Sequence, residues 1–243
     1  MFEAGFHTMP DGRRIAFRLA AGSDPAVAFL PGYQSDMAGS KATALFEWSE
    51  LTGHCCLLLD YSGCGESEGE FADGTLTRWC DEVVALIEAR LSGEVILVGS
   101  SMGGWLMLLA ARRLGARVAA MVGIAAAPDF TDWGFDDRQK AQLAAGTTLR
   151  QNNPYGPEPT RVHPCFWADG EALHQLDGPI PFDGPVRLFH GQDDNDVPPE
   201  ISLRLAAALR SQDVQVTLVK GGDHRLSREQ DIALLLRTVA ELT

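Results

Sequence analysis

The chain of 243 residues is 45% hydrophobic and 22% charged, which fits one globular domain and excludes a disordered or fibrous protein. Acidic residues exceed basic residues by 33 − 20 = 13, so nucleic acid and anionic membrane surfaces are disfavoured as partners. The five cysteines include no CxxC pair, which predicts free thiols in a reducing compartment and no zinc site or disulfide framework.

The start of the chain carries no evident targeting signal, and no stretch of it is predicted to span a membrane. The opening residues MFEAGFHTMPDGRR contain no basic region followed by an apolar core, and they are not rich in arginine and serine. No apolar stretch approaches the ~20 residues that a membrane-spanning helix needs. We therefore expect a soluble, cytoplasmic protein without membrane insertion.

Short apolar runs alternate along the chain with longer helical patterns, which is typical of a mostly parallel sheet with helices on both faces. Strands are expected at 13–19 (an edge strand), 26–30, 55–60, 95–98, 118–124, 186–189 and 214–219. Helices are expected at 37–51, 76–91, 102–114, 200–210 and 227–242. Thr75 is a candidate N-cap and Gly115 a candidate helix stop. The pattern predicts an α/β fold in a single domain covering residues 1–243.

One stretch, residues 128–185, interrupts the alternation. It carries eight of the thirteen prolines and no clear strand, and five of its aromatic residues stand among glycines and charged residues: Trp133, Phe135, Tyr155, Phe166 and Trp167. A segment this long is either a lid or a disordered insert. The aromatic residues favour an ordered lid, inserted at about residues 128–180.

The strongest local motif is Gly99-Ser100-Ser101-Met102-Gly103, a G-x-S-x-G sequence. An apolar strand leads into it and a helical pattern leaves it, which is the strand–turn–helix setting of a nucleophile elbow. The alternative is an ordinary serine-rich turn, which the two flanks disfavour. We predict Ser101 as the nucleophile, with Ser100 as packing or polar support.

A serine nucleophile needs a base, and in proteins with such an elbow an acid and then a histidine follow it along the chain. Strand 214–219 leads to His224, which is therefore the predicted base. Strand 186–189 leads to three competing acids, namely Asp193, Asp194 and Asp196. Both loops follow the carboxyl ends of strands, where catalytic groups of such sheets gather. Asp223 would point away from its neighbour His224, and the remaining histidines precede strands, sit in early loops, fall in 128–185 or end a strand: His7, His54, His163, His174 and His190. Of these, His190 is expected to be structural and to brace its loop.

An oxyanion hole requires two backbone N–H donors. The amide of Met102, directly after the nucleophile, is one candidate, and Tyr33 in the loop Leu30-Pro31-Gly32-Tyr33 supplies the other. An ordinary Pro-Gly turn is the alternative for this loop. The glycine-rich loop 60–67 lacks the spacing of phosphate-binding loops, and Cys64 within it is not expected to act as a nucleophile.

Together these residues resemble the α/β-hydrolase superfamily, and within it the branch of α/β-hydrolase domain-containing protein 10, mitochondrial acyl-protein thioesterases and acyl-glucuronide esterases. The resemblance rests on PGYQSDMAGSKA at 31–42, DYSGCGESEG at 60–69, LVGSSMGGWLMLLAA at 97–111, PIPFDGPVRLFHGQDDNDVP at 179–198 and DHRLSREQDI at 223–232. It implies a Ser101–Asp194–His224 triad, because HGxxDxxVP counted from His190 places the acid at Asp194. The segment 129–165 matches least, and no mitochondrial presequence is evident at the N-terminus.

The expected activity is hydrolysis of a carboxylic ester or thioester, small or protein-linked, through an acyl-enzyme, without metal or organic cofactor. The aromatic lid suggests an apolar acyl pocket. Alternatives are a general carboxylesterase, a serine peptidase and a catalytically silent binding module. Haloalkane dehalogenation is disfavoured, because that chemistry uses an aspartate at the elbow.

Overall fold

The computed structural model describes residues 2–154 and 156–243, so Tyr155, one of the five aromatic residues noted above, lies outside the described residues. Its main sheet has eight strands in the order β1-β2-β4-β3-β5-β6-β9-β10. The strands are β1 Phe2–Thr8, β2 Arg14–Ala20, β3 Ser23–Leu30, β4 His54–Leu59, β5 Val95–Ser100, β6 Val118–Ile124, β9 Val186–Gly191 and β10 Val214–Val219. β1 and β2 run antiparallel to their neighbours, and the rest pair in parallel.

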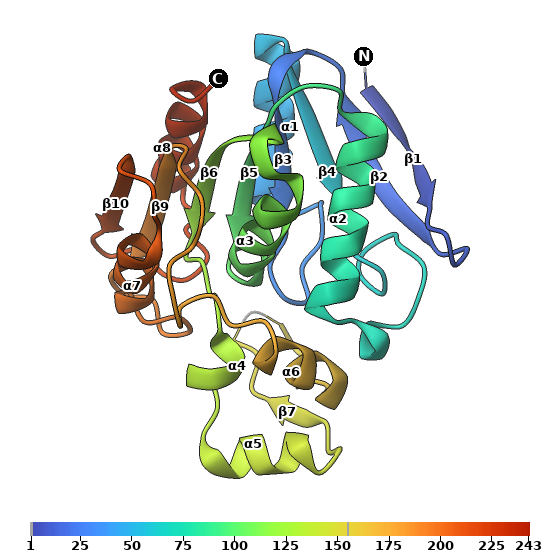
Figure 1. The fold of residues 1–243 in the computed structure, drawn as a ribbon, viewed down its shortest axis with the longest axis vertical. Coiled ribbons are helices and arrows are strands. Elements are labelled where there is room, and N and C mark those ends of the chain that lie inside the picture. The colour runs from blue at the N-terminus through green and yellow to red at the C-terminus, as the bar shows by residue number, and fades with distance from the viewer. Residues whose placement is uncertain (1, 155) are drawn as a thin grey trace.

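Helices cover both faces of this sheet (Figure 1). They are α1 Ser40–Thr52, α2 Leu76–Arg90, α3 Met102–Leu114, α7 Glu200–Ala208 and α8 Glu229–Ala240, with 3₁₀ turns η1 Phe71–Asp73 and η2 Gly115–Arg117. α2, α3 and α7 pack into the hydrophobic cluster on one face, and α1 and α8 into the cluster on the other. The predicted α/β architecture is thereby confirmed.

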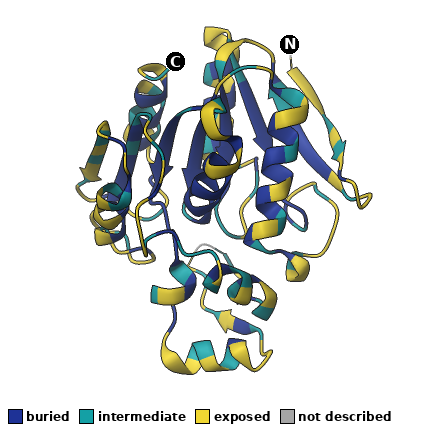
Figure 2. Ribbon diagram, in the orientation of Figure 1, coloured by how far each residue is buried: buried dark blue, intermediate teal, exposed yellow. Residues whose placement is uncertain are grey.

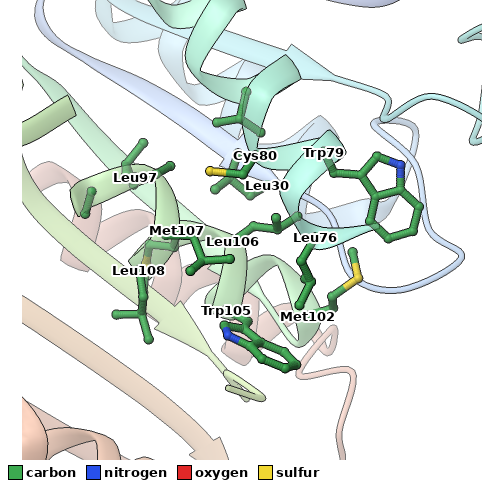
Figure 3. Packing of buried hydrophobic residues seen from close by; sticks show 14 of the residues in the cluster. Leu30, Leu76, Trp79, Cys80, Leu97, Met102, Trp105, Leu106, Met107 and Leu108 are labelled. Carbon is green, nitrogen blue, oxygen red and sulfur yellow. The ribbon is translucent and has the colours of Figure 1, made fainter. Parts of the chain in front are cut away.

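The best-predicted part of the chain is the centre of the sheet. Every residue of β5 is buried, as a strand covered on both faces should be, and Figure 2 shows the buried residues concentrated in the central strands. α3 begins and ends as predicted, with Gly115 at φ 56° after its last residue. Figure 3 shows Trp79 of α2 and Trp105 of α3 among the residues of the hydrophobic core, and both side chains are fully buried.

The strand expected at 13–19 is present as β2, but its expected place at the edge of the sheet is wrong. β2 lies inside the sheet, because β1 pairs along its whole length as the true edge, and His7 lies within β1. Phe2, Ala4 and Phe6 alternate along β1 as in a strand, but no residue of β1 is fully buried, so this strand lacks the buried face that marks the inner strands.

The segment between β6 and β9, residues 125–185, is called the insertion below. It contains α4 Phe130–Trp133, α5 Asp137–Ala144, a small antiparallel pair of β7 Leu149–Gln151 and β8 Thr160–Val162, and α6 Pro164–Glu171. The prediction of a segment without strands missed β7 and β8. Figure 1 shows the insertion below the end of the main sheet, beneath α2 and α3.

Side chains attach the insertion to the sheet domain. Asp169 accepts hydrogen bonds from the amide and hydroxyl of Thr77 at the start of α2, at 2.8 and 2.7 Å. The indole of Trp105 donates to the Leu173 carbonyl at 3.2 Å. Buried Asp129 accepts from the amides that follow α6, at 2.7 Å each, and so joins the two ends of the insertion.

Candidate active site

The turn between β5 and α3 holds Ser101 in a backbone conformation that is rare outside glycine, with φ 54° and ψ −120°. Two glycines make this turn possible. A Cβ on Gly103 would lie 2.0 Å from the Leu30 carbonyl oxygen, and one on Gly99 would lie 2.4 Å from the Gly103 carbonyl oxygen. The chain therefore turns against β3, and Ser101 stands at the N-terminus of α3.

Three predicted residues, contributed by loops after β5, β9 and β10, form one hydrogen-bonded chain. His224 Nε2 lies 3.0 Å from Ser101 Oγ, and His224 Nδ1 lies 2.9 Å from Asp194 Oδ2. A carboxylate only accepts hydrogen bonds, so Nδ1 carries a proton and Nε2 accepts from the serine hydroxyl. The serine is thus bonded to a nitrogen that can take its proton.

Four donors surround the Asp194 carboxylate, which is fully buried. Oδ1 accepts from the amides of Asp196 and Val197, at 2.9 Å each, and Oδ2 accepts from His224 and from His190 Nε2 at 3.2 Å. Burial alone raises the pKa of Asp194. The hydrogen bonds from His190 and His224 lower this pKa by a larger amount, so the net pKa lies below its ordinary value. Asp194 therefore remains ionised at neutral pH.

The competing aspartates occupy other positions. Asp193 is exposed, and Asp223 accepts from the Leu226 amide at 3.0 Å. Asp196 is also exposed and lies at the mouth of the cleft described below. Its carboxylate and the ligand atoms of Asp194 and His224 lie within 4.8 Å of one another, so these three could hold a metal ion only at the expense of the Asp194–His224 bond.

His190 has a larger part in the site than loop bracing alone. It is completely buried, its Nδ1 lies 2.6 Å from Ser202 Oγ, and its Nε2 is within 2.9 Å of the Val197 carbonyl oxygen. The same Nε2 contacts Asp194, so His190 binds both ends of the acid loop. The only sequence signal was its position at a strand end, four residues before Asp194.

Met102 directly follows Ser101, and the loop that carries Tyr33 passes next to it. A Cβ on Gly32 would be 3.3 Å from Ser101 Cβ, which places the Gly32–Tyr33 loop directly beside the nucleophile. Among the described residues, the amides of Tyr33 and Met102 donate no hydrogen bond to the protein. Two N–H groups therefore remain for an oxygen of a bound ligand. Cys64 is buried, and burial raises the pKa of its thiol to about 12, so it is a poor nucleophile at neutral pH.

A cleft of about 470 Å³ opens over Ser101 and His224. Most of the side chains that line it are polar or charged, among them Lys41, Arg225, Gln34, Asn152 and Thr160. None of the described aromatic residues of the insertion is among the lining residues. Phe166 instead packs against Tyr33, Trp79 and Phe130 with ring centroids 4.8 to 5.7 Å apart. Within the described residues, the expected apolar pocket of insertion aromatics is therefore not found at this cleft.

Lys41 was not anticipated from the sequence. It lies in the first turn of α1, and its Nζ donates to the Arg225 carbonyl oxygen at 2.5 Å and contacts Ser227 Oγ at 3.4 Å. Burial, followed by the neighbouring Arg225, lowers its pKa to about 8. Lys41 thus fixes the backbone directly after His224 and brings a positive charge to the cleft wall.

Residues 27–237 match the model of the alpha/beta hydrolase family. The chain is 37% identical over 241 residues to human "Palmitoyl-protein thioesterase ABHD10, mitochondrial", covering 98% of this chain and 79% of that protein, and 38% identical over 234 residues to its mouse counterpart, covering 94% and 78%. A solved putative hydrolase from Agrobacterium vitis S4 superposes with a TM-score of 0.92 at 37% identity, covering 100% of this chain and 98% of that one. Mouse alpha/beta hydrolase domain-containing protein 10 also gives 0.92, at 35% identity, covering 99% and 98%.

The names of these relatives contradict the expected cytoplasmic location, because they point to mitochondria. That expectation came from free cysteines and from the N-terminal residues. Free thiols exclude a disulfide framework but do not distinguish one reducing compartment from another. No described helix is long and apolar enough to span a bilayer.

Proposed function

This chain belongs to the alpha/beta hydrolase family, and on that premise we propose that it is a serine hydrolase that cleaves carboxylic thioesters or esters through an acyl-enzyme. The observation that carries the proposal is the chain of hydrogen bonds from Ser101 through His224 to Asp194, at 3.0 and 2.9 Å. The same residue types in the same order of contact activate serine in unrelated hydrolases.

In the first half-reaction His224 Nε2 takes the proton of Ser101 as Oγ attacks the substrate carbonyl carbon. The resulting imidazolium is stabilised by Asp194, which also holds the Nδ1–H tautomer. The amides of Tyr33 and Met102 bind the carbonyl oxygen as it becomes negative. Each such donor stabilises the transition state by about 3 kcal/mol.

Collapse of the tetrahedral intermediate expels the leaving thiolate or alkoxide, which receives the proton from His224. Water then enters, His224 removes its proton, and attack on the acyl-enzyme releases the carboxylic acid and restores Ser101. Every proton transfer uses one imidazole nitrogen, so the cycle needs no metal and no organic cofactor.

The substrate proposed is an acyl thioester on a protein or an acyl ester of a sugar acid. The thioester substrate is supported by the names of the relatives, which are palmitoyl-protein thioesterases. The ester of a sugar acid is supported by the polar lining of the cleft. Lys41, Arg225 and several amide side chains there suit the hydroxyl and carboxylate groups of a glucuronyl leaving group. The insertion is proposed to act as a lid, because residues 151–154 and Thr160 form one wall of this cleft.

The test compares kcat/KM for a long-chain acyl thioester and an acyl glucuronide, using the wild type and Ser101→Ala. We expect both substrates to be cleaved by the wild type, and the variant to lose turnover and labelling by a fluorophosphonate. Cleavage of simple aryl esters alone would reduce the proposal to a general carboxylesterase. Absence of labelling in the wild type would mean that the hydrolase fold serves only binding.

A further inference from the structure

The side chain of Tyr33, in the predicted oxyanion loop, joins the insertion to the sheet domain. Its hydroxyl donates a hydrogen bond to the Arg161 carbonyl oxygen in β8, at 2.8 Å. Its ring contacts Phe130 of α4 and Phe166 of α6, with centroids 6.1 and 4.8 Å away. Three elements of the insertion therefore contact the residue that supplies an oxyanion amide.

The same ring also contacts the sheet domain. Phe71 of η1 and Trp79 of α2 lie 5.1 and 6.3 Å from it, in edge-to-face arrangements. Such aromatic contacts add about 0.5–1.5 kcal/mol each beyond their burial. Burial also raises the pKa of Tyr33 well above its ordinary value, so the hydroxyl keeps the proton that it donates to Arg161.

The ends of the oxyanion loop are held by a different set of contacts, all within the sheet domain. At the start, the Tyr61 hydroxyl donates to the Pro31 carbonyl oxygen at 3.0 Å. At the end, the Met37 amide donates to Asp60 Oδ1 at 2.7 Å. Between these two points the backbone turns through Gln34, a non-glycine residue at φ 54°, which is a strained conformation that needs support from its surroundings.

The ends of the loop are held by the sheet domain, whereas the Tyr33 side chain in its middle is held by the insertion as well. We infer that Tyr33 is a positioning residue, whose side chain uses the insertion to hold the Tyr33 amide at the oxyanion position. The inference rests on the proposed hydrolase function. The insertion then contributes to turnover as well as to the cleft wall. Loss of its contact with Tyr33 leaves the amide bonded covalently in the loop but free to move away from the substrate oxygen.

Tyr33→Phe tests the inference, because it removes the hydroxyl that reaches Arg161 and keeps the ring. Outright loss of an oxyanion donor lowers kcat by about 10²–10³, and a donor that is present but loosened should lower it by about tenfold. KM should change less than about twofold, because the donor acts mainly in the transition state. The rate of fluorophosphonate labelling should fall with kcat, since the phosphoryl oxygen occupies the same position.

Gln139→Ala is the matched control. It removes a hydrogen bond inside the insertion, which the Asp136 amide donates to Gln139 Oε1 at 3.0 Å at the start of α5, and it changes none of the contacts of Tyr33 given above. Its kcat should remain within about twofold of the wild type. Amide hydrogen exchange of a peptide covering residues 31–37 should quicken in Tyr33→Phe and not in Gln139→Ala.

Two outcomes would overturn the inference while leaving the hydrolase proposal intact. One is wild-type kcat and wild-type exchange at 31–37 in Tyr33→Phe. The other is an equal loss of kcat in Gln139→Ala, which would show that any loosening of the insertion has the same effect. A wild type that neither labels at Ser101 nor turns over substrate would instead refute the proposed function itself.

Discussion

Replacement of Asp194 by asparagine separates the effect of this carboxylate on the His224 tautomer from its effect on folding stability. In the wild type, Asp194 Oδ1 accepts hydrogen bonds from two backbone amides. In the variant, the side-chain carbonyl oxygen of the asparagine takes this position and keeps both bonds. The amide nitrogen then takes the place of Oδ2, where it faces two N–H groups, those of His224 and His190. Two donors cannot bond to each other, so His224 must move its proton from Nδ1 to Nε2.

The magnitude follows from that change of tautomer. A protonated Nε2 points its hydrogen at Ser101 Oγ and cannot take the serine proton. The equivalent change in a serine hydrolase triad lowers kcat by about 10⁴, which corresponds to roughly 5.4 kcal/mol at 1.36 kcal/mol per tenfold. His190 keeps the Val197 carbonyl as an acceptor, so the folding cost is that of one compromised buried hydrogen bond, about 1–3 kcal/mol.

The assay is kcat/KM on an aryl ester, with the melting temperature measured on the same samples. Asp193→Asn is the matched control, because this exposed carboxylate lies in the same loop, and it should retain activity within about threefold. Asp196→Asn tests the competing acid. The reasoning fails if Asp194→Asn keeps more than a tenth of the wild-type kcat/KM. It also fails if Asp193→Asn or Asp196→Asn lowers kcat/KM more than Asp194→Asn does.

Three further predictions concern stability. Gly103→Ala places a Cβ 2.0 Å from a carbonyl oxygen and should destabilise the fold by about 3 kcal/mol or more, lowering the melting temperature by about 6–12 °C. Gly178→Ala, where a Cβ meets nothing within 4 Å, should melt like the wild type. The lowered pKa of Lys41, about 8, means that the unfolded chain binds more protons between pH 8 and ~10.4, so wild-type stability relative to Lys41→Met should rise with pH across that window. Urea unfolding at several pH values measures this, and a constant difference would contradict the assigned pKa. The pKa of Asp194 lies below its ordinary value, so its contribution is complete above about pH 4 and is lost below it. The stability difference between the wild type and Asp194→Asn, followed in acid titrations, should therefore narrow below pH 4 and stay constant above it.

The sheet core was predictable because its signals are local. β5 is a continuous apolar run and α3 ends at a glycine, so sequence and structure agree there to within a residue or two. The insertion lacks such signals, since its helices and strands are 3–8 residues long in the structure. Elements this short are not stable alone and depend on tertiary anchors, such as Asp129 and Asp169, whose partners lie 46 and 92 residues away in sequence.

Some residues of the site could likewise be predicted from the sequence and others could not. Proximity of Ser101 and His224 could be predicted, because both follow the carboxyl ends of parallel strands of one sheet. Spacing alone left three aspartates open, and only the path of the backbone shows which carboxylate faces His224. Lys41 was missed as a contributor, and for His190 the bracing of its loop was predicted but its contact with Asp194 was not. Both contacts depend on side-chain directions that no periodicity reveals.

The composition of the insertion supported the wrong inference about the cleft for a physical reason. Aromatic side chains in a proline-rich segment can face the substrate or attach the segment to the domain, and the sequence pattern is the same in both cases. Here Phe130 and Phe166 pack on Tyr33, while the polar residues of the β7–β8 region face the cleft. Substitutions of these aromatics should therefore act on kcat through the oxyanion loop, and substitutions at Asn152 or Thr160 should act on the choice of leaving group.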